Sequence, residues 1–342
     1  IFTPVNWGSS GRVCLKVKGV RMNAGKLTRH GARERFLKIA LPVFICAFLA
    51  LIMPLPGGGS QRALAALGEV LLYSSSAAGE PGNGSSSSPT CTPDGRYVAF
   101  SSPATNLVTG DNNGKSDVFR KDVLTGTVIR CSTDAAGQEA NDHGYAPSIS
   151  ADGRYVAFHS KASNLVAGDG NGVEDIFVKD IVTGNIVRCS TDHSGAEANG
   201  ASLNPSLSAD GALVAFESAA SNLVAADGNG VKDVFVKDIA SSAIARVSCD
   251  SGGSDGNGES ASAAISADSR YVAFRSKASN LVTGDGNGVE DVFRKDMSTG
   301  AVATCSATAA GTLGNRASGA PSISADGRYV AFESSSDRKS VV

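Results

Sequence analysis

Hydrophobic residues in this chain come in short alternating runs that turn residues separate. Over residues 147–204 the order is PSIS, an Asp-Gly pair, RYVAF, a longer link, DIFVKD, a Thr-Gly pair and NIVRCS. Runs of four to six residues with alternating polarity, bounded by such pairs, are typical of β-strands joined by hairpins. We therefore expect four antiparallel strands and no helix in this stretch.

The same pattern recurs at a fixed distance along the chain. The phenylalanine of the YVAF-like run is found every 58 residues, at Phe100, Phe158, Phe216, Phe274 and Phe332. A strict period indicates stacked units that cannot bury their apolar faces alone. Four strands per unit favour an all-β fold, a β-propeller with four-stranded blades around a central channel. A right-handed solenoid of strands is the alternative, although parallel β-helices use much shorter coils.

The repeat divides most of the chain, and the propeller region is expected at 66–336. Complete units are expected at 89–146, 147–204, 205–262 and 263–320. Residues 70–88 match the end of a unit and 321–336 match the start of one. The ring is therefore expected to be incomplete in this chain, with the partial first blade completed by C-terminal strands in an intact protein, which leaves no exposed sheet edge. Residues 337–342 lose the register and are interpreted as an artefactual tail.

The N-terminal part has a different composition. Residues 1–21 precede Met22 and are interpreted as non-native upstream translation. Residues 22–65 contain a basic segment, an uncharged apolar run at 39–53 and a terminal Ala-Leu-Ala, which is the layout of a signal peptide. A membrane anchor is the alternative, but this run is short for a span of about 20 residues. We expect export to the periplasm or the extracellular space, with membrane contact only through the signal segment.

Charge and cysteine content bear on the expected partners and on the role of the thiols. The chain has 31 Lys and Arg against 33 Asp and Glu, and no basic block outside the leader, so nucleic acid is not an expected partner. Cys131, Cys189 and Cys305 share one register of the repeat, where the third unit has Val247. Alternation of cysteine with valine predicts buried free thiols that act as small core residues. Cys249 has no cysteine counterpart in the other units.

The most regular polar element is a loop of the form Asp-x-Asn-Gly-x-x-Asp. It occurs four times, as Asp111, Asn113 and Asp117, then Asp169, Asn171 and Asp175, then Asp227, Asn229 and Asp233, and finally Asp285, Asn287 and Asp291. Oxygen ligands around a glycine turn could bind calcium, although the spacing is not that of an EF-hand. The structural interpretation is a tight Asn-Gly turn whose carboxylates accept hydrogen bonds from turn amides. Calcium is the one cofactor considered.

Other positions give weaker signals. The residue after the marker phenylalanine varies as Ser101, His159, Glu217, Arg275 and Glu333, which indicates a solvated face or, less simply, a recognition surface. The sequence contains no Gly-x-Ser-x-Gly elbow, no metal-type histidine pair and no nucleotide-binding loop. We therefore expect no enzymatic activity and no catalytic residues.

The units, with SADGRYVAF followed by DVFVKD and a Thr-Gly pair, resemble the TolB-like, WD-like β-propeller repeat of exported bacterial proteins. The resemblance covers 70–336. It implies a bladed ring that serves as a periplasmic or cell-surface interaction platform. We expect a non-catalytic scaffold that binds a protein or a surface glycan. The alternatives are the propeller of a truncated serine peptidase of the prolyl oligopeptidase type, since some members form the front domain of such enzymes, and a purely structural surface repeat.

Overall fold

The computed structural model describes residues 71–225 and 227–336, all of which belong to the second of two compact units, 47–342. The described part consists of strands, turns and loops. It has no helix that is long and apolar enough to cross a membrane. The expected upstream segment 1–21, the signal peptide 22–65 and the tail 337–342 lie outside the described residues.

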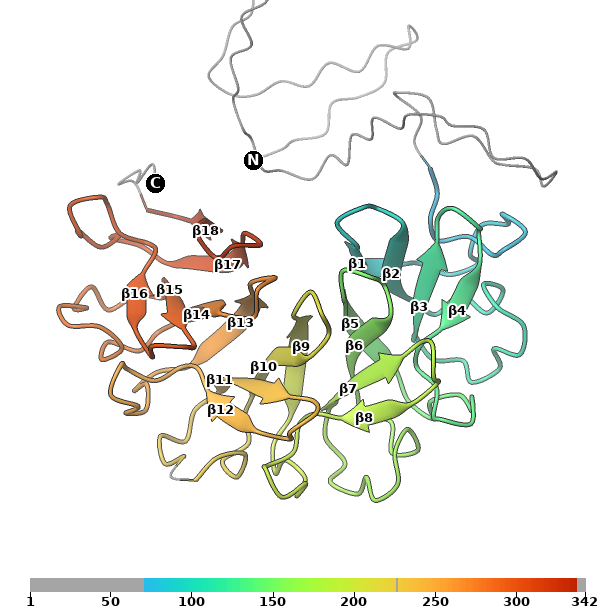
Figure 1. Ribbon diagram of the computed structural model, residues 1–342, viewed down its shortest axis with the longest axis horizontal. Coiled ribbons are helices and arrows are strands. Elements are labelled where there is room, and N and C mark those ends of the chain that lie inside the picture. Colours follow the sequence, from blue (N-terminus) through green and yellow to red (C-terminus); the bar gives the residue numbers. More distant parts are fainter. Residues whose placement is uncertain (1–70, 226, 337–342) are drawn as a thin grey trace, which may run out of the picture. The chain divides into compact units, whose positions relative to one another are not determined.

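Four sheets of four antiparallel strands follow one another, and a sheet of two strands comes last (Figure 1). The first contains β1 (Ser87–Cys91), β2 (Tyr97–Ser102), β3 (Asp117–Asp122) and β4 (Val128–Arg130). The second contains β5 (Gly144–Ile149), β6 (Tyr155–Ser160), β7 (Asp175–Asp180) and β8 (Ile186–Arg188). The third contains β9 (Ser202–Leu207), β10 (Leu213–Ser218), β11 (Asp233–Asp238) and β12 (Ile244–Arg246). The fourth contains β13 (Ser260–Ile265), β14 (Tyr271–Ser276), β15 (Asp291–Asp296) and β16 (Val302–Thr304). The last contains β17 (Ser318–Ile323) and β18 (Val330–Ser334).

This arrangement is a β-propeller of up-and-down blades, as the repeat predicts. In every complete blade the strands are hydrogen-bonded in chain order, with tight turns at the first and third connections and a longer loop between the second and third strands. The first strands, β1, β5, β9, β13 and β17, lie innermost, and the short fourth strands lie at the periphery (Figure 1). The alternative of a solenoid with parallel strands is excluded by this antiparallel pairing.

The hairpin between the first two strands of a blade depends on the preceding blade. Gly153 has a φ of 73°, and a Cβ at this position would overlap the ring of Tyr97 in the first blade. Glycine is therefore required both for the turn and for the contact. The fourth blade has Ser269 at this place, with a φ of 64°, and the preceding blade has Leu213 where the others have tyrosine. The two departures belong together, because the smaller leucine leaves room for the serine side chain.

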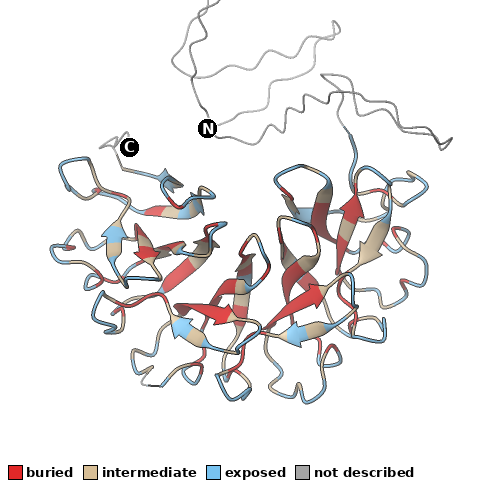
Figure 2. Ribbon diagram, viewed as in Figure 1, coloured by how far each residue is buried: buried red, intermediate tan, exposed pale blue. Residues whose placement is uncertain are grey.

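The hydrophobic core lies between blades rather than inside one sheet. One buried cluster joins Ile176 and Cys189 of the second blade to Val214 and Phe216 of the third, and equivalent clusters join the other neighbours. Figure 2 shows these buried positions on the middle strands of each blade. Apolar burial of this kind contributes about 25 cal/mol per Å² of surface removed from water. The interpretation of the register cysteines is confirmed for Cys131 and Cys189, which are buried and free, while Cys305 is free and half-buried.

Lysines of the third strands also connect neighbouring blades. They are buried and equivalent: Lys121, Lys179, Lys237 and Lys295. The Lys237 ammonium donates to the backbone carbonyls of Thr191 at 2.9 Å and Asp192 at 2.8 Å in the preceding blade. Cys249 occupies the place of that threonine in the next blade, and the Lys295 ammonium donates to its carbonyl at 3.0 Å and lies 2.7 Å from its Sγ. This contact gives Cys249 the structural role that the sequence alone did not reveal.

The residue after the marker phenylalanine is buried at the join between blades. Ser101, His159 and Glu217 are 1%, 9% and 3% exposed. The Glu217 carboxylate accepts a hydrogen bond from the amide of Ser262 in the next blade at 2.8 Å. At the equivalent place one blade earlier, His159 Nδ1 accepts a hydrogen bond from the amide of Asn204 at 3.4 Å. The interpretation of this position as a solvated face is therefore wrong in these units, because the residue meets the first strand of the following blade.

The two partial units differ in how much of a blade they form. Residues 71–86 form no strand, but an isolated bridge joins Ser75 and Pro81, as another joins Thr133 and Glu139 one unit later. The loop of this segment thus matches the loop one unit later, and the assignment of 70–88 to a partial blade stays a prediction. The unit beginning at 321 contributes to the sheet of β17 and β18. Closure of the ring by strands from both ends stays a prediction.

Candidate functional site

The four Asp-x-Asn-Gly-x-x-Asp loops connect the second and third strands of the four complete blades. In the second blade, Asp175 begins β7 and is fully buried. Its two carboxylate oxygens accept hydrogen bonds from the hydroxyl of Ser190 and from Nδ2 of Asn171. Asn171 also donates to the carbonyl of Ala198 at 3.1 Å and accepts the amide of Val173 at 3.1 Å. The asparagine is thus a turn residue whose amide nitrogen faces the carboxylate.

The same contacts recur in the other three loops. Asn113, Asn229 and Asn287 donate to Asp117, Asp233 and Asp291. Ser132, Ser248 and Ser306 donate to the same three aspartates. The expected Asn-Gly turn is therefore present, with positive φ at Gly114, Gly172, Gly230 and Gly288. The last aspartate of each loop accepts hydrogen bonds from Asn and Ser side chains rather than from turn amides.

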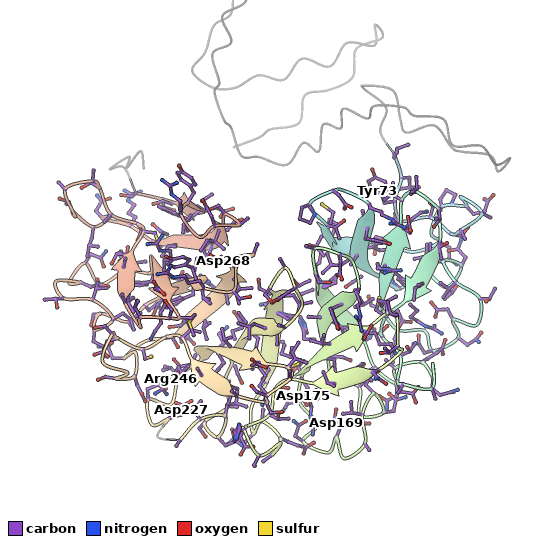
Figure 3. All side chains as sticks on the ribbon, viewed as in Figure 1. Tyr73, Asp169, Asp175, Asp227, Arg246 and Asp268 are labelled. Atoms are coloured by element: carbon purple, nitrogen blue, oxygen red, sulfur yellow. The ribbon has the colours of Figure 1, made fainter. Side chains whose placement is uncertain are left out.

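An arginine that the sequence analysis did not single out completes three of these loops. Arg188 ends β8, and its Nη1 lies 3.2 Å from Asp169, 3.9 Å from Asp175 and 2.5 Å from Glu197. Figure 3 shows Asp169 and Asp175 of this cluster, and Asp227 with Arg246 in the next blade. The guanidinium is a planar donor that can serve several carboxylates at once. We call this arrangement of two loop aspartates, one arginine and one further acid the arginine cluster.

The first blade has an equivalent arginine cluster, and the third blade has one in which the arginine pairs with only the first of the two loop aspartates. Arg130 lies 3.5 Å from Asp111, 3.6 Å from Asp117 and 2.5 Å from Glu139. Arg246 pairs with Asp227 at 3.3 Å and with Asp255. The signal was present in the sequence, because these arginines stand 58 residues apart and each is followed nine residues later by an acid.

Burial changes the acid–base behaviour of the first aspartate of each loop. The pKa of Asp111 and that of Asp169 are each raised to about 6, chiefly because burial removes water and also because a second carboxylate lies close. The arginine opposes this shift. The pKa of Asp227 and that of Asp285 are raised for the same reasons. These carboxyls therefore titrate closer to neutrality than an exposed aspartate does.

The calcium hypothesis for these loops remains a prediction. Within residues 71–225 and 227–336, no group of three or more His, Cys, Asp and Glu side chains is arranged to hold a metal ion. In the first three blades the arginine already supplies positive charge between the carboxylates. A cation in those loops would have to displace a buried guanidinium.

A second candidate lies on the central axis. The first strands of all five described sheets line one depression of about 410 Å³, through Ser88 and Pro89, Ala146 and Pro147, Asn204 and Pro205, Ser262 and Ala263, and Ala320 and Pro321. In each pair the first residue has a φ between 47° and 56°. The strand register shifts at the same place, for example between Tyr145 and Ser148. A repeated bulge therefore places proline or alanine at the channel mouth.

Comparisons with known proteins agree with the observed fold. No family model and no curated protein matches the sequence. Among solved structures, the chain is similar to TolB from Acinetobacter baumannii, with 21% identity and a TM-score of 0.44 over 72% of this chain and 48% of that one. It thus spans about half the length of that protein. A structure described as TolB from Agrobacterium tumefaciens gives 19% identity and a TM-score of 0.44, over 72% of this chain and 73% of that one.

A prolyl endopeptidase structure is also similar, with 14% identity and a TM-score of 0.40 over 65% of this chain and 29% of that one. The blades themselves confirm the expected β-propeller fold with four-stranded blades.

Proposed function

We propose that this chain is an exported β-propeller that acts as a non-catalytic interaction scaffold and binds a segment of another protein in its central depression. The observation that carries the proposal is the depression itself, which equivalent positions of five blades line together. Its lining is uncharged and combines proline rings with small side chains. Such a surface suits an uncharged stretch of polypeptide, because it offers apolar contact without a charge to desolvate.

The backbone strain at the depression supports a role beyond the fold. Ala146, Asn204 and Ala320 all have φ near 50°, which residues other than glycine seldom adopt. Backbone conformations that are seldom adopted cluster at sites that bind ligands, and here every blade has one at the same surface. The partner class proposed is a protein, and a surface glycan is the competing outcome.

Binding at the depression can be tested with displayed peptides. The full chain is used to select binders from a random peptide library, and the selected peptides are then measured on two variants. Ala146→Trp fills the mouth of the depression without changing the handedness of its backbone, because alanine already has a Cβ there. Ala167→Trp, on an exposed loop of the same blade, is the matched control.

We expect peptides that bind the wild type and the control and lose at least tenfold in affinity on Ala146→Trp. Equal binding to all three proteins would contradict the proposal. Selection of oligosaccharides from a glycan array, with no peptide binder, would replace the protein partner by a glycan.

Export is supported by the layout of residues 22–65. A fusion of the full chain to alkaline phosphatase, which is active only outside the cytoplasm, tests it. We expect enzymatic activity from the fusion and none when the apolar run at 39–53 is deleted. An active fusion without that run would overturn export through this segment.

A further inference from the structure

The fourth blade keeps the carboxylates of the arginine cluster but not its arginine. Thr304 ends β16 where the other blades have arginine, and Leu313 stands where they have Glu139, Glu197 or Asp255. Asp285, Asn287 and Asp291 retain their places. The hydrogen bonds from Asn287 and Ser306 to Asp291, at 2.6 and 2.5 Å, are those of the other loops. The carboxylate pair is thus held in the same arrangement without its internal cation.

A cavity lies where the arginine side chain would be. It has a volume of about 320 Å³ and is lined by Asp285, Ala303, Thr304, Ala307 and Leu313, among others. Asp285 is 9% exposed and has no ion pair among the described residues. Its carboxylate is served by the backbone amide of Asn287. A charged group this well buried is normally paired.

We propose that this cavity, which we call the fourth-blade pocket, binds a guanidinium group supplied by another molecule, namely an arginine side chain of a protein partner. In each of the other three blades the first loop aspartate holds a guanidinium, at 3.5, 3.2 and 3.3 Å, and in the first and second blades the second loop aspartate also lies within 3.9 Å of it. In the fourth blade Asp291 keeps the donor from Asn287, and Asp285 lines open space.

The wall of the pocket fits the rest of an arginine side chain. Ala303, Ala307 and Leu313 give apolar contact for the methylene groups, and Thr304 contributes a hydroxyl. Because Leu313 replaces the acid, Asp285 is the one carboxylate among the residues that line the pocket. A guanidinium can form two parallel hydrogen bonds to one carboxylate, whereas a lysine ammonium is a compact point charge with strong hydration. The pocket therefore favours arginine over lysine.

The inference goes beyond the proposed scaffold function, because the fourth-blade pocket shares no lining residue with the central depression. Either surface can fail its test while the other passes. The Ala146→Trp variant described above is expected to bind arginine ligands as the wild type does.

The test uses the full chain and N-acetyl-arginine methylamide as probe, with binding measured by calorimetry and by ligand-observed NMR. We expect saturable binding with a Kd on the order of millimolar, as for a single ion-paired group. N-acetyl-lysine methylamide is expected to bind at least tenfold more weakly. Asp285→Asn should weaken arginine binding by at least tenfold, and the matched control Asp169→Asn in the second blade should leave it unchanged.

A second variant rebuilds the internal cluster. Thr304→Arg with Leu313→Glu gives the fourth blade the residues of the second, so the pocket is filled from within and arginine binding is expected to disappear in a folded protein. Unchanged binding by this double variant, or no saturation by the arginine probe in the wild type, overturns the proposal. Calcium chloride that binds the wild type and excludes the arginine probe would overturn it in favour of a metal site.

Discussion

The second and fourth blades have the same strands, the same loop and the same pair of buried aspartates, yet they differ in how those aspartates are neutralised. In the second blade Arg188 lies between Asp169 and Glu197. In the fourth, Thr304 and Leu313 leave a cavity beside Asp285. The loop geometry is kept in both. The arginine therefore does not shape the loop, since the asparagine and serine hydrogen bonds hold it in place.

The fourth blade departs from its neighbours at the hairpin too, with a different outcome. Ser269 replaces the turn glycine, and Leu213 in the preceding blade replaces the tyrosine that would meet it. This departure is compensated by the change in size of the facing residue. In the cluster, Leu313 replaces the acid that pairs with arginine elsewhere, but Asp285 keeps its carboxylate and has no ion pair among the described residues. The contrast is between a matched change in packing and a buried carboxylate whose cation is missing.

Removal of the arginine from a complete cluster should have the largest effect. Arg188→Ala leaves the buried Asp169 and Asp175 without their cation, so we expect a loss of about 3 kcal/mol in the free energy of unfolding. Thr304→Ala, at the equivalent place in the fourth blade, should change it by less than about 0.5 kcal/mol. Denaturant unfolding of the full-length variants measures both. Equal losses would mean that the two blades do not differ in the way described.

The compensated departure can be broken and rebuilt one blade earlier. Gly211→Ser is expected to cost about 2 kcal/mol, because the added side chain meets Tyr155 and the turn requires a positive φ. Adding Tyr155→Leu recreates the pair found at Ser269 and Leu213 and should recover about half of the loss. A double-mutant cycle from denaturant unfolding gives the coupling energy. Strictly additive effects would show that the two positions are independent.

The pH dependence of stability should reflect the raised pKa values of the loop aspartates. The pKa of Asp169 rises from 3.8 to about 6 on folding, so the folded state binds more protons than the unfolded state between these values. Stability therefore falls as pH increases from about 4 to about 6, by on the order of 1 kcal/mol for each such group. The pH dependence is measured from the unfolding midpoints of the wild type and of the double variant Asp111→Asn, Asp169→Asn across this pH range. A wild-type curve as flat as that of the variant would contradict the expectation.

The smallest effect is expected at a third departure that the chain also compensates. Cys249 replaces a threonine in the join between the third and fourth blades, and its carbonyl and sulfur both face the Lys295 ammonium. Cys249→Thr restores the hydroxyl found at Thr191 and should change the free energy of unfolding by less than about 0.5 kcal/mol. Cys249→Val keeps a side chain of similar size but removes the sulfur that faces the Lys295 ammonium, so it should lower the free energy of unfolding by more. Thermal unfolding of both variants compares them.

Much of the fold could be predicted from the sequence, because it depends on local patterns that repeat. Alternation in RYVAF and DIFVKD, with glycine at most of the turns, is enough to predict the strands of every complete blade. The free, buried state of Cys131 and Cys189 followed from their exchange with Val247. These features need only the near neighbours of a residue, which the printed sequence contains.

The rest depends on contacts between segments that lie apart along the chain, either in neighbouring units or within one unit. Glu217 was expected to be solvated, because its position varies in polarity, but it caps a backbone amide of the next blade. Arg188 lies far along the chain from Asp169, and only the folded sheet brings the fourth strand beside that loop. The bulge at Ala146 also escaped prediction, since the strained residue differs in type from blade to blade.

The lysine contacts between blades all run in one direction, from a third strand back to the loop that precedes its own blade. Each unit therefore carries the donor for the unit before it and the acceptor for the unit after it. An extra unit of 58 residues inserted in register would donate to the unit before it and accept from the unit after it. After deletion of one unit, its two neighbours would form the same contact with each other. Gene duplication and loss can thus change the number of blades in such a protein without requiring any new interface to evolve.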